Sequence, residues 1–307
     1  MKPPRLHLRV ALVVAATLST AVCGYSLNYV ASVSSGDWQT VGTWNRPGTP
    51  GPADDVYIRG ATVNSSRHVQ VNGAAGSVNL LFIGEAGRGI LTINADGSLS
   101  VTGAPGVQVA YESINGARGE LYINGGSLSA SVTRVGAGSN AGSGFMSITN
   151  GTLNAGNMTI GGSSATTQRT GVFQINGAGS TISGGTLTVT NYGTLDFNFG
   201  ATGISTLNFD SISLGETSTV LIDGAAYTGG SGTFTLLSAA TSLTGYNASL
   251  FSIAGFGPAY TTELGFDADA RSVVLTVTAI PEPATYALAF GALALGLVAY
   301  RRKHARS

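Results

Sequence analysis

The sequence predicts an all-β protein whose main body is a right-handed parallel β-helix, a β-solenoid with Gly-rich coils of about 26 residues. Three observations lead to this prediction. Glycine provides 45 of the 307 residues, only 10% of residues are charged, and 43% are apolar. The apolar share excludes a disordered chain, and the absence of a G-X-Y run excludes collagen. The third observation, an internal repeat of about 26 residues, is typical of stacked supersecondary units.

Two apolar markers repeat through the middle of the chain. The first recurs at spacings of 26, 26 and 25 residues, at Ile83, Val109, Val135 and Ile160. The second is an alternating apolar–polar segment that ends near Asn and precedes a further apolar residue; its four copies begin at Leu91, Leu121, Met146 and Phe173, and the residues that follow are Leu99, Leu128, Leu153 and Ile182. Alternation is the period of a half-buried strand, and Asn and Gly tolerate the backbone of tight corners. We therefore expect solenoid repeats over residues 79–200, with apolar side chains stacked inside coils that lie about 4.8 Å apart.

The two ends of the solenoid require caps, because an open end presents unpaired strand edges. Residues 25–78 are expected to supply an N-terminal cap and the first strands, with Trp38 and Trp44 in the capping segment Asp37–Gly60. Residues 201–279 contain less glycine and longer strands. They are expected to form a C-terminal β region, either a sandwich-like cap or irregular last coils.

The N-terminus has the layout of a secretory signal peptide, assigned to residues 1–24. Basic residues between Lys2 and Arg9 precede an apolar run from Val10 to Val22. This pattern predicts export through the translocon. Cys23 is the only cysteine, so no intrachain disulfide can form. Lipidation of Cys23 and an uncleaved membrane anchor are the alternatives.

The C-terminus, residues 280–307, carries a second signal. An uncharged apolar run, Ala284–Tyr300, follows a Pro-Glu-Pro sequence and precedes a basic end. A helix of this length spans roughly 25 Å, the short end of what crosses a bilayer. We expect a single transmembrane helix over residues 284–300. The basic tail should stay cytoplasmic, which places the middle of the chain outside the cytoplasm.

This C-terminal pattern resembles the PEP-CTERM sorting domain of Gram-negative bacteria, although many members have Val where this chain has Ile280. The resemblance implies that exosortase, an integral-membrane cysteine protease, recognises and processes the protein. The implied sorting signal comprises a recognition element and a stop-transfer element: Pro281, Glu282 and Pro283, then Arg301, Arg302 and Lys303. Members of this family often accompany exopolysaccharide and biofilm genes. A plain membrane anchor is the alternative. The repeats themselves resemble the passenger domains of autotransporters.

The charged residues of the repeat region do not recur at one coil position, so we expect them to be scattered and solvated. They are the acids Glu85, Asp96, Glu112, Glu120 and Asp196 and the bases Arg88, Arg118, Arg134 and Arg169. His68, the only histidine outside the terminal segments, lies in an alternating segment and is expected to be an exposed strand residue. No catalytic, cofactor-binding or metal site is therefore expected.

Three other groups of residues have a chemical and a structural interpretation. Asp54 with Asp55 fits a turn and strand start better than an acid pair, and Asp267 with Asp269 fits a turn better than a calcium site. The aromatic residues are expected to pack in the cap and coils, with stacking on sugar rings as the alternative; they are Trp38, Trp44, Tyr111 and Tyr122.

The charge distribution excludes one class of function. The middle of the chain contains no lysine and no basic face, which excludes nucleic-acid binding. The resulting hypothesis is a non-enzymatic, exported repeat protein. Its precursor is anchored in the inner membrane, and its mature form lies on the surface or in the extracellular matrix with a structural or adhesive role and exopolysaccharide as a partner. The alternative is a polysaccharide-binding or polysaccharide-degrading β-helix protein.

Overall fold

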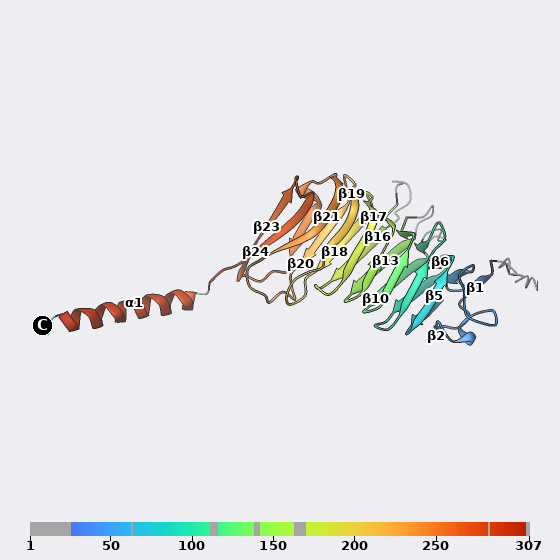
Figure 1. Cartoon of the computed structure of the whole chain (residues 1–307), viewed down its shortest axis with the longest axis horizontal. Helices are drawn as coiled ribbons and strands as arrows, with labels where there is room; N and C mark the ends of the chain where they lie inside the picture. Colours follow the sequence, from blue (N-terminus) through green and yellow to red (C-terminus); the bar gives the residue numbers. More distant parts are fainter. Residues whose placement is uncertain are drawn as a thin grey trace, which may run out of the picture.

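The computed structural model describes residues 26–62, 64–110, 116–137, 142–162, 170–281 and 283–304. The predicted signal peptide lies outside these residues, as do Tyr111, Glu112, Arg169 and Glu282. The described chain is a β-solenoid, which confirms the predicted all-β class (Figure 1). Within the described residues, helix is limited to two short 3-10 turns, η1 (Val41–Thr43) and η2 (Ala248–Leu250), and to α1 (Pro283–His304).

The strands of the solenoid stack in three faces. Face A contains β1 (Asn28–Val30), β3 (Asp55–Ile58), β6 (Leu80–Ile83), β9 (Val107–Val109), β12 (Val132–Val135) and β15 (Asn157–Ile160). Face B contains β5 (Ala74–Val78), β8 (Ser98–Val101), β11 (Ser127–Ala130) and β14 (Thr152–Asn154). Face C is a nine-stranded sheet: β2 (Ser35–Asp37), β4 (Ser66–Val71), β7 (Arg88–Ile93), β10 (Arg118–Asn124), β13 (Ser143–Thr149), β16 (Thr170–Asn176), β18 (Gly193–Asn198), β20 (Thr219–Asp223) and β22 (Phe251–Ala254).

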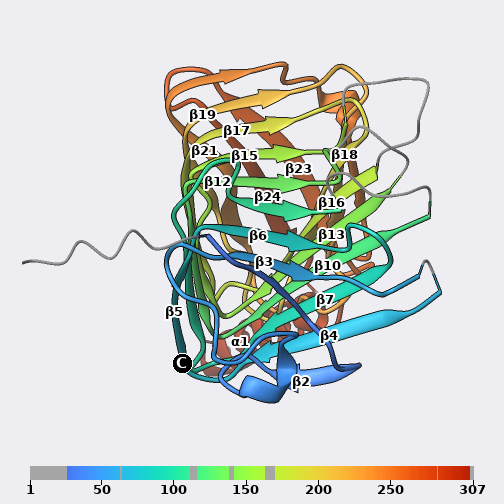
Figure 2. The same ribbon diagram turned by 90° about the vertical axis from the view of Figure 1, so that its right-hand side faces the viewer.

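The chain visits the faces in the order A, C, B, and each strand pairs in parallel with strands of the neighbouring coils. Figure 2 shows the strands of face A and of face C stacked beside one another. From β17 (Thr181–Val189) onward, faces A and B merge, because this one strand pairs with β14 through its first half and with β15 through its second. The longer strands β19 (Leu207–Leu214) and β21 (Gly232–Thr244) continue the merged face. Parallel pairing therefore extends on both sides of residues 79–200.

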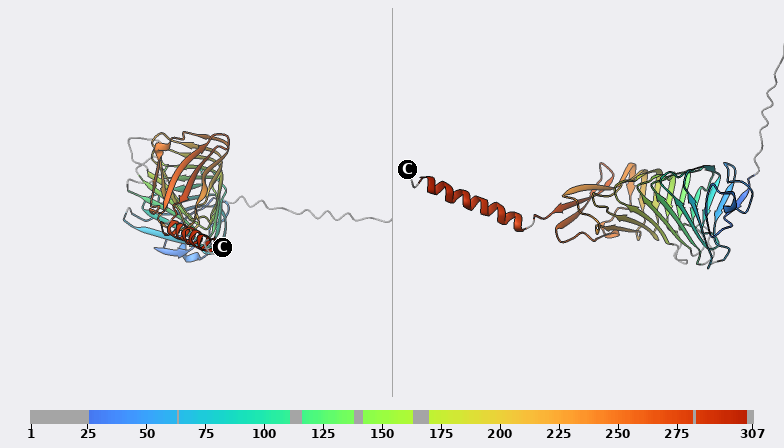
Figure 3. Two further views of the ribbon diagram at one scale, coloured as in Figure 1. Left: turned by 90° about the vertical axis from the view of Figure 1, so that its left-hand side faces the viewer. Right: turned by 90° about the horizontal axis from the view of Figure 1, so that it is seen from below.

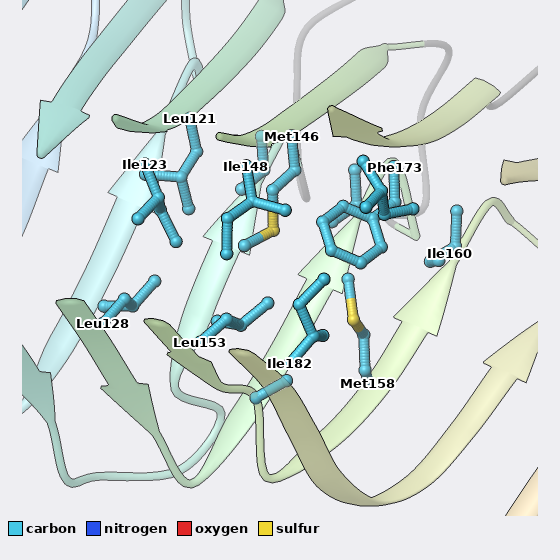
Figure 4. Close-up of a cluster of buried hydrophobic side chains, with 14 of the residues drawn as sticks. Leu121, Ile123, Leu128, Met146, Ile148, Leu153, Met158, Ile160, Phe173 and Ile182 are labelled. Carbon is cyan, nitrogen blue, oxygen red and sulfur yellow. The ribbon is translucent and has the colours of Figure 1, made fainter. Parts of the chain in front are cut away.

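The register reproduces the apolar markers of the sequence. Ile83 aligns with Val109, Val109 with Val135, and Val135 with Ile160. On face C the apolar pairs that begin at Leu91, Leu121, Met146 and Phe173 align in the same way. Their side chains meet inside the coils, where Ile123, Ile148 and Phe173 lie opposite Leu128, Leu153 and Ile182 (Figure 4). All of these residues are at most 1% exposed, and each fully buried side chain contributes about 1.5–3 kcal/mol through burial.

A column of stacked glycines closes the corner between faces A and C. Gly89, Gly119, Gly144, Gly171 and Gly193 align in successive coils. A Cβ atom at any of these positions would overlap the carbonyl oxygen at the end of the face A strand in the preceding coil. Backbone therefore packs directly on backbone at this corner, which only glycine permits. This explains why glycine recurs at this one position in five successive coils.

Both ends of the solenoid carry aromatic clusters. In the N-terminal segment, Trp38 and Trp44 are buried with ring centroids 5.0 Å apart, and the Trp44 indole N–H donates to the Trp38 carbonyl oxygen at 2.9 Å. At the other end, Tyr227 packs against Phe199 and Phe234. There β24 (Ser272–Ala279) pairs antiparallel with β21 and with β23 (Tyr260–Asp267), so the parallel stacking ends on an antiparallel layer.

Helix α1 follows this layer and stands away from the solenoid (Figure 3). The structure thus has a helix over the segment predicted to be helical. Large apolar side chains of α1 are exposed: Phe290, Leu293, Leu295, Leu297, Val298 and Tyr300. Within the described part of the chain, no helix combines the length and the apolar character that a membrane crossing requires.

Candidate binding site on face C

The outward side chains of face C form columns that run along the solenoid. One column is polar and aligns Asn124 with Thr149, Asn176, Asn198 and Asp223. Nδ2 of Asn198 donates to the side-chain oxygen Oδ1 of Asn176 at 3.1 Å, and farther toward the N-terminus Nδ2 of Asn94 donates to Oδ1 of Asn72 at 2.5 Å. In the neighbouring column the Gln174 amide donates to Asp196 at 2.9 Å. These hydrogen bonds connect one coil with the next.

The strongest polar cluster of face C surrounds Glu120 on β10. Arg88 on β7 contacts both carboxylate oxygens, with Nε 2.7 Å from Oε1 and Nη2 2.9 Å from Oε2. Nε of Arg118 lies 2.7 Å from Oε1, and the Tyr122 hydroxyl donates to Oε2 at 2.8 Å. The Glu120 side chain is only 1% exposed, whereas those of Arg88 and Arg118 are 47% and 53% exposed. The expectation that these three residues are scattered is therefore wrong, and the expectation that they are solvated is wrong for Glu120, whereas Arg88 and Arg118 are exposed.

The register explains why this cluster forms. Arg88 and Arg118 align in neighbouring coils, which places two like charges side by side on one face. Glu120 lies two residues after Arg118 and reaches both guanidinium groups. The carboxylate therefore neutralises part of an arginine stack that would otherwise repel itself.

The electrostatics keep Glu120 ionised. Burial raises the pKa of this carboxyl, but the hydrogen bonds from Arg88 and Tyr122 and the charge of Arg118 outweigh burial and hold the pKa below its ordinary value. The hydrogen bond to Glu120 raises the pKa of Arg88, and burial together with the same carboxylate raises the pKa of Tyr122. An ionised acid with both oxygens occupied is unsuited to general acid catalysis.

His68 on β4 lies at the N-terminal side of this cluster. Its Nε2 atom is 2.9 Å from the Thr92 hydroxyl oxygen. Burial lowers the pKa of the His68 imidazole, which the charge of Glu120 opposes and that of Arg88 reinforces. His68 is half-buried and hydrogen-bonded rather than exposed, which corrects the sequence expectation.

Several other charged residues of the sequence lie apart from this cluster. Glu85 pairs with Arg59. Asp54 accepts hydrogen bonds from the backbone of Leu27 and Gly51, and Asp267 accepts them from Asp269 and Ala270, as expected for turns. Asp96 is exposed in a turn, and Arg134 lies on β12. Among the residues described, no three His, Cys, Asp or Glu side chains are grouped so that they could hold a metal ion.

The sorting-signal residues lie at the start and end of α1. Pro281 is exposed just before the helix, and Pro283 is the first helical residue. Arg301 is exposed in the last turn, and the helix continues through Arg302 and Lys303.

The face C cluster suits binding better than bond cleavage. The side chains of Arg88 and Arg118 keep roughly half of their surface exposed. They lie beside Tyr122, whose ring centroid is 5.6 Å from that of Phe145. Cationic and aromatic groups side by side are suited to anionic or hydroxylated ligands. No family model, curated protein or solved structure matches this chain.

Proposed function

We propose that the protein is an exported structural or adhesive component of a Gram-negative cell envelope or extracellular matrix, sorted by exosortase through its C-terminal segment. The observation that carries the proposal is the contrast between a solenoid with its own complete core and a tail that stands outside it with exposed apolar residues. Such a tail can be removed without opening the core.

Two finer features belong to the proposal. One is insertion of residues 284–300 into the inner membrane before processing, for which the uncharged run and the basic end Arg301–Lys303 provide the support. The other is the right-handed winding of the solenoid, the hand that parallel β crossovers favour. The polar outer columns of face C suit a spacer that must stay soluble in a hydrated matrix.

The test of sorting is mass spectrometry of the protein from surface material of its native host. We expect no peptide beyond about residue 283 in the mature protein. Deletion of exosortase, or the double substitution Pro281→Ala with Pro283→Ala, should leave peptides that contain Arg301 in the membrane fraction. Pro258→Ala, which changes a proline before β23, is the matched control and should be processed normally. An intact tail in mature surface material would overturn the proposal.

The second candidate function is polysaccharide binding by face C, which the exposed Arg88 and Arg118 beside Tyr122 favour. An acidic polysaccharide would meet two cations and an aromatic ring on one flat surface. Retention of the full-length chain on an acidic polysaccharide column, lost on Arg118→Gln and kept on Arg46→Gln, would favour this function. Equal retention of the two variants would exclude this surface.

A further inference from the structure

The outward side chains of face C change in character toward its C-terminal end. Starting from Tyr122, one column continues through successive coils as Ser147, Gln174, Asp196, Leu221 and Ser252. Leu221 on β20 is the aliphatic member of this stretch and is 39% exposed. On β22, the last strand of face C, the outward residues Ser252 and Ala254 are small, whereas Phe251 and Ile253 pack against the core. The short outward side chains of β22 leave a hollow beside the longer ones of β18 and β20.

The hollow is an open cavity of about 490 Å³. Leu221 provides an apolar side, and four polar residues also line the cavity: Asp196, Asn198, Asp223 and Ser252. The register places Asn198 beside Asp223 and Asp196 beside Leu221. Paired positions on neighbouring strands lie about 4.8 Å apart, so these side chains surround one small space. The volume lies within the range of small-molecule sites in proteins.

Three side chains of the cavity each keep one oxygen atom free. Oδ2 of Asp196 accepts a hydrogen bond from Gln174, and Oδ1 of Asp223 accepts one from the Ala225 N–H group, both at 2.9 Å. The Asn198 amide nitrogen donates to the preceding coil. Oδ1 of Asp196, Oδ1 of Asn198 and Oδ2 of Asp223 therefore have no partner among the described residues. Asp223 is exposed, and the described buried atoms that lack a partner lie elsewhere, so a ligand can reach these three oxygens.

The charge of the cavity is negative. Among the described residues that line it there are two aspartates and no basic residue. Arg271 is the only base within residues 170–281, and its Nε atom donates to the Ala239 carbonyl oxygen on β21 of the merged face. Three free acceptors and two negative charges match a ligand that donates hydrogen bonds and carries a positive charge.

We propose that this cavity binds the primary ammonium group of an amino sugar. An ammonium group carries three N–H donors, which equals the number of free acceptor oxygens. Hydrogen bonds between an ammonium group and a carboxylate are charge-assisted and stronger than neutral ones. Leu221 offers an apolar surface to the C–H groups of the sugar ring, and the Ser252 hydroxyl can exchange a hydrogen bond with a ring hydroxyl. The site does not depend on how the chain is sorted, and it lies farther along face C than the Glu120 cluster.

Isothermal titration calorimetry on the full-length chain tests the proposal at constant ionic strength and about pH 6, where carboxylates are ionised and primary amines are protonated. The probes are glucosamine, methylamine and the neutral N-acetylglucosamine. We expect glucosamine to bind at one site and N-acetylglucosamine not to bind. Asp196→Asn and Asp223→Asn should each weaken glucosamine binding at least about threefold, because one charged contact at a partly exposed site is lost. Asp210→Asn, which removes an exposed acid on β19 outside the cavity, is the matched control and should bind as the wild type does.

A thermal unfolding scan of each variant shows whether it is folded, so a loss of binding can be attributed to the site. Leu221→Ser places in β20 the residue that β22 has in the same column, and it should weaken the binding of glucosamine but not of methylamine. Tighter binding of glucosamine than of methylamine would support the amino sugar as the ligand class. Absence of glucosamine binding to the wild type, equally tight binding of N-acetylglucosamine or methylamine, unchanged binding by both aspartate variants, or binding of calcium chloride alone would each overturn the proposal.

Discussion

The solenoid and helix α1 are both rich in apolar residues, but these residues are buried in the solenoid and exposed in α1. Phe173 on β16 is fully buried, whereas Phe290 on α1 is 70% exposed. In the solenoid, apolar residues alternate with polar ones and recur in register, so that Phe173 aligns with Met146 in one neighbouring coil and with Leu195 in the other. In the part of α1 whose side chains are described, from Phe290 to Tyr300, the large apolar residues are exposed and no second element covers them. Periodicity, and not hydrophobicity alone, therefore decides which residues form the core.

The largest expected difference between the two regions comes from equivalent truncations. Phe173→Ala should lower the free energy of unfolding by about 3–5 kcal/mol, because it leaves a cavity between stacked coils. Phe290→Ala should leave the free energy of unfolding unchanged. Urea titration followed by tryptophan fluorescence measures both, since the buried Trp38 and Trp44 lie within the solenoid. A similar loss in both variants would show that α1 packs on the body.

The second comparison lies within the solenoid and concerns two glycines. Gly171→Ala should cost about 1–3 kcal/mol, because the new methyl group overlaps the Val135 carbonyl oxygen and the backbone of Gly161. Gly257→Ala is the matched control, since a Cβ atom at this position meets nothing within 4 Å. The same titration measures both variants. A neutral Gly171→Ala would mean that the corner is looser than the backbone packing indicates.

The inward apolar residues and the glycines of the A–C corner also differ in how far the sequence predicts them. The inward residues Ile83, Val109, Val135 and Ile160 could be aligned because each carries an apolar signal at a nearly constant spacing. The glycine column is harder to detect, since Gly119 and Gly144 are two of 45 glycines and have no side chain that distinguishes them. It becomes visible once the strands are aligned, because each of these glycines stands two residues before an inward apolar residue.

The Glu120 cluster illustrates a second reason for a missed prediction. Arg88 and Glu120 are 32 residues apart, which is more than one average coil, so a fixed period does not bring them together. The spacing from Ile93 to Ile123 is 30 residues, whereas that from Val71 to Ile93 is 22. Coil length varies here, and only the strand register shows which charges meet.

The third and smallest expected effect concerns this cluster. Glu120→Gln should lower the free energy of unfolding by about 1–2 kcal/mol at neutral pH, because it leaves Arg88 and Arg118 aligned without their counterion. Asp96→Asn, an acid exposed in a turn, is the control and should be close to neutral. Urea titration at low and high salt measures both variants. Loss of the difference at high salt would show that the cluster acts only as a screened surface pair.

The pH dependence of stability follows from the same groups. The pKa of Glu120 in the folded protein lies below its ordinary value, so its contribution is present at neutral pH and lost as the pH falls below about 4.5. The pKa of His68 is also lowered, so the unfolded chain takes up a proton more readily and stability begins to fall below about pH 6.5. Glu120→Gln should remove the lower step and keep the upper one. An unchanged profile would contradict this assignment.

Because the coils stack in register, the length of the solenoid can differ by whole coils. Gly119 and Gly144 occupy the same place in adjacent turns. Viewed along the solenoid axis they lie one above the other, so deleting the turn between them would join equivalent backbone positions. Each turn contributes about 4.8 Å, and the nine strands of face C give a rod about 38 Å long. Gain or loss of whole turns would lengthen or shorten the solenoid in fixed increments while its cross-section and surface chemistry stayed the same.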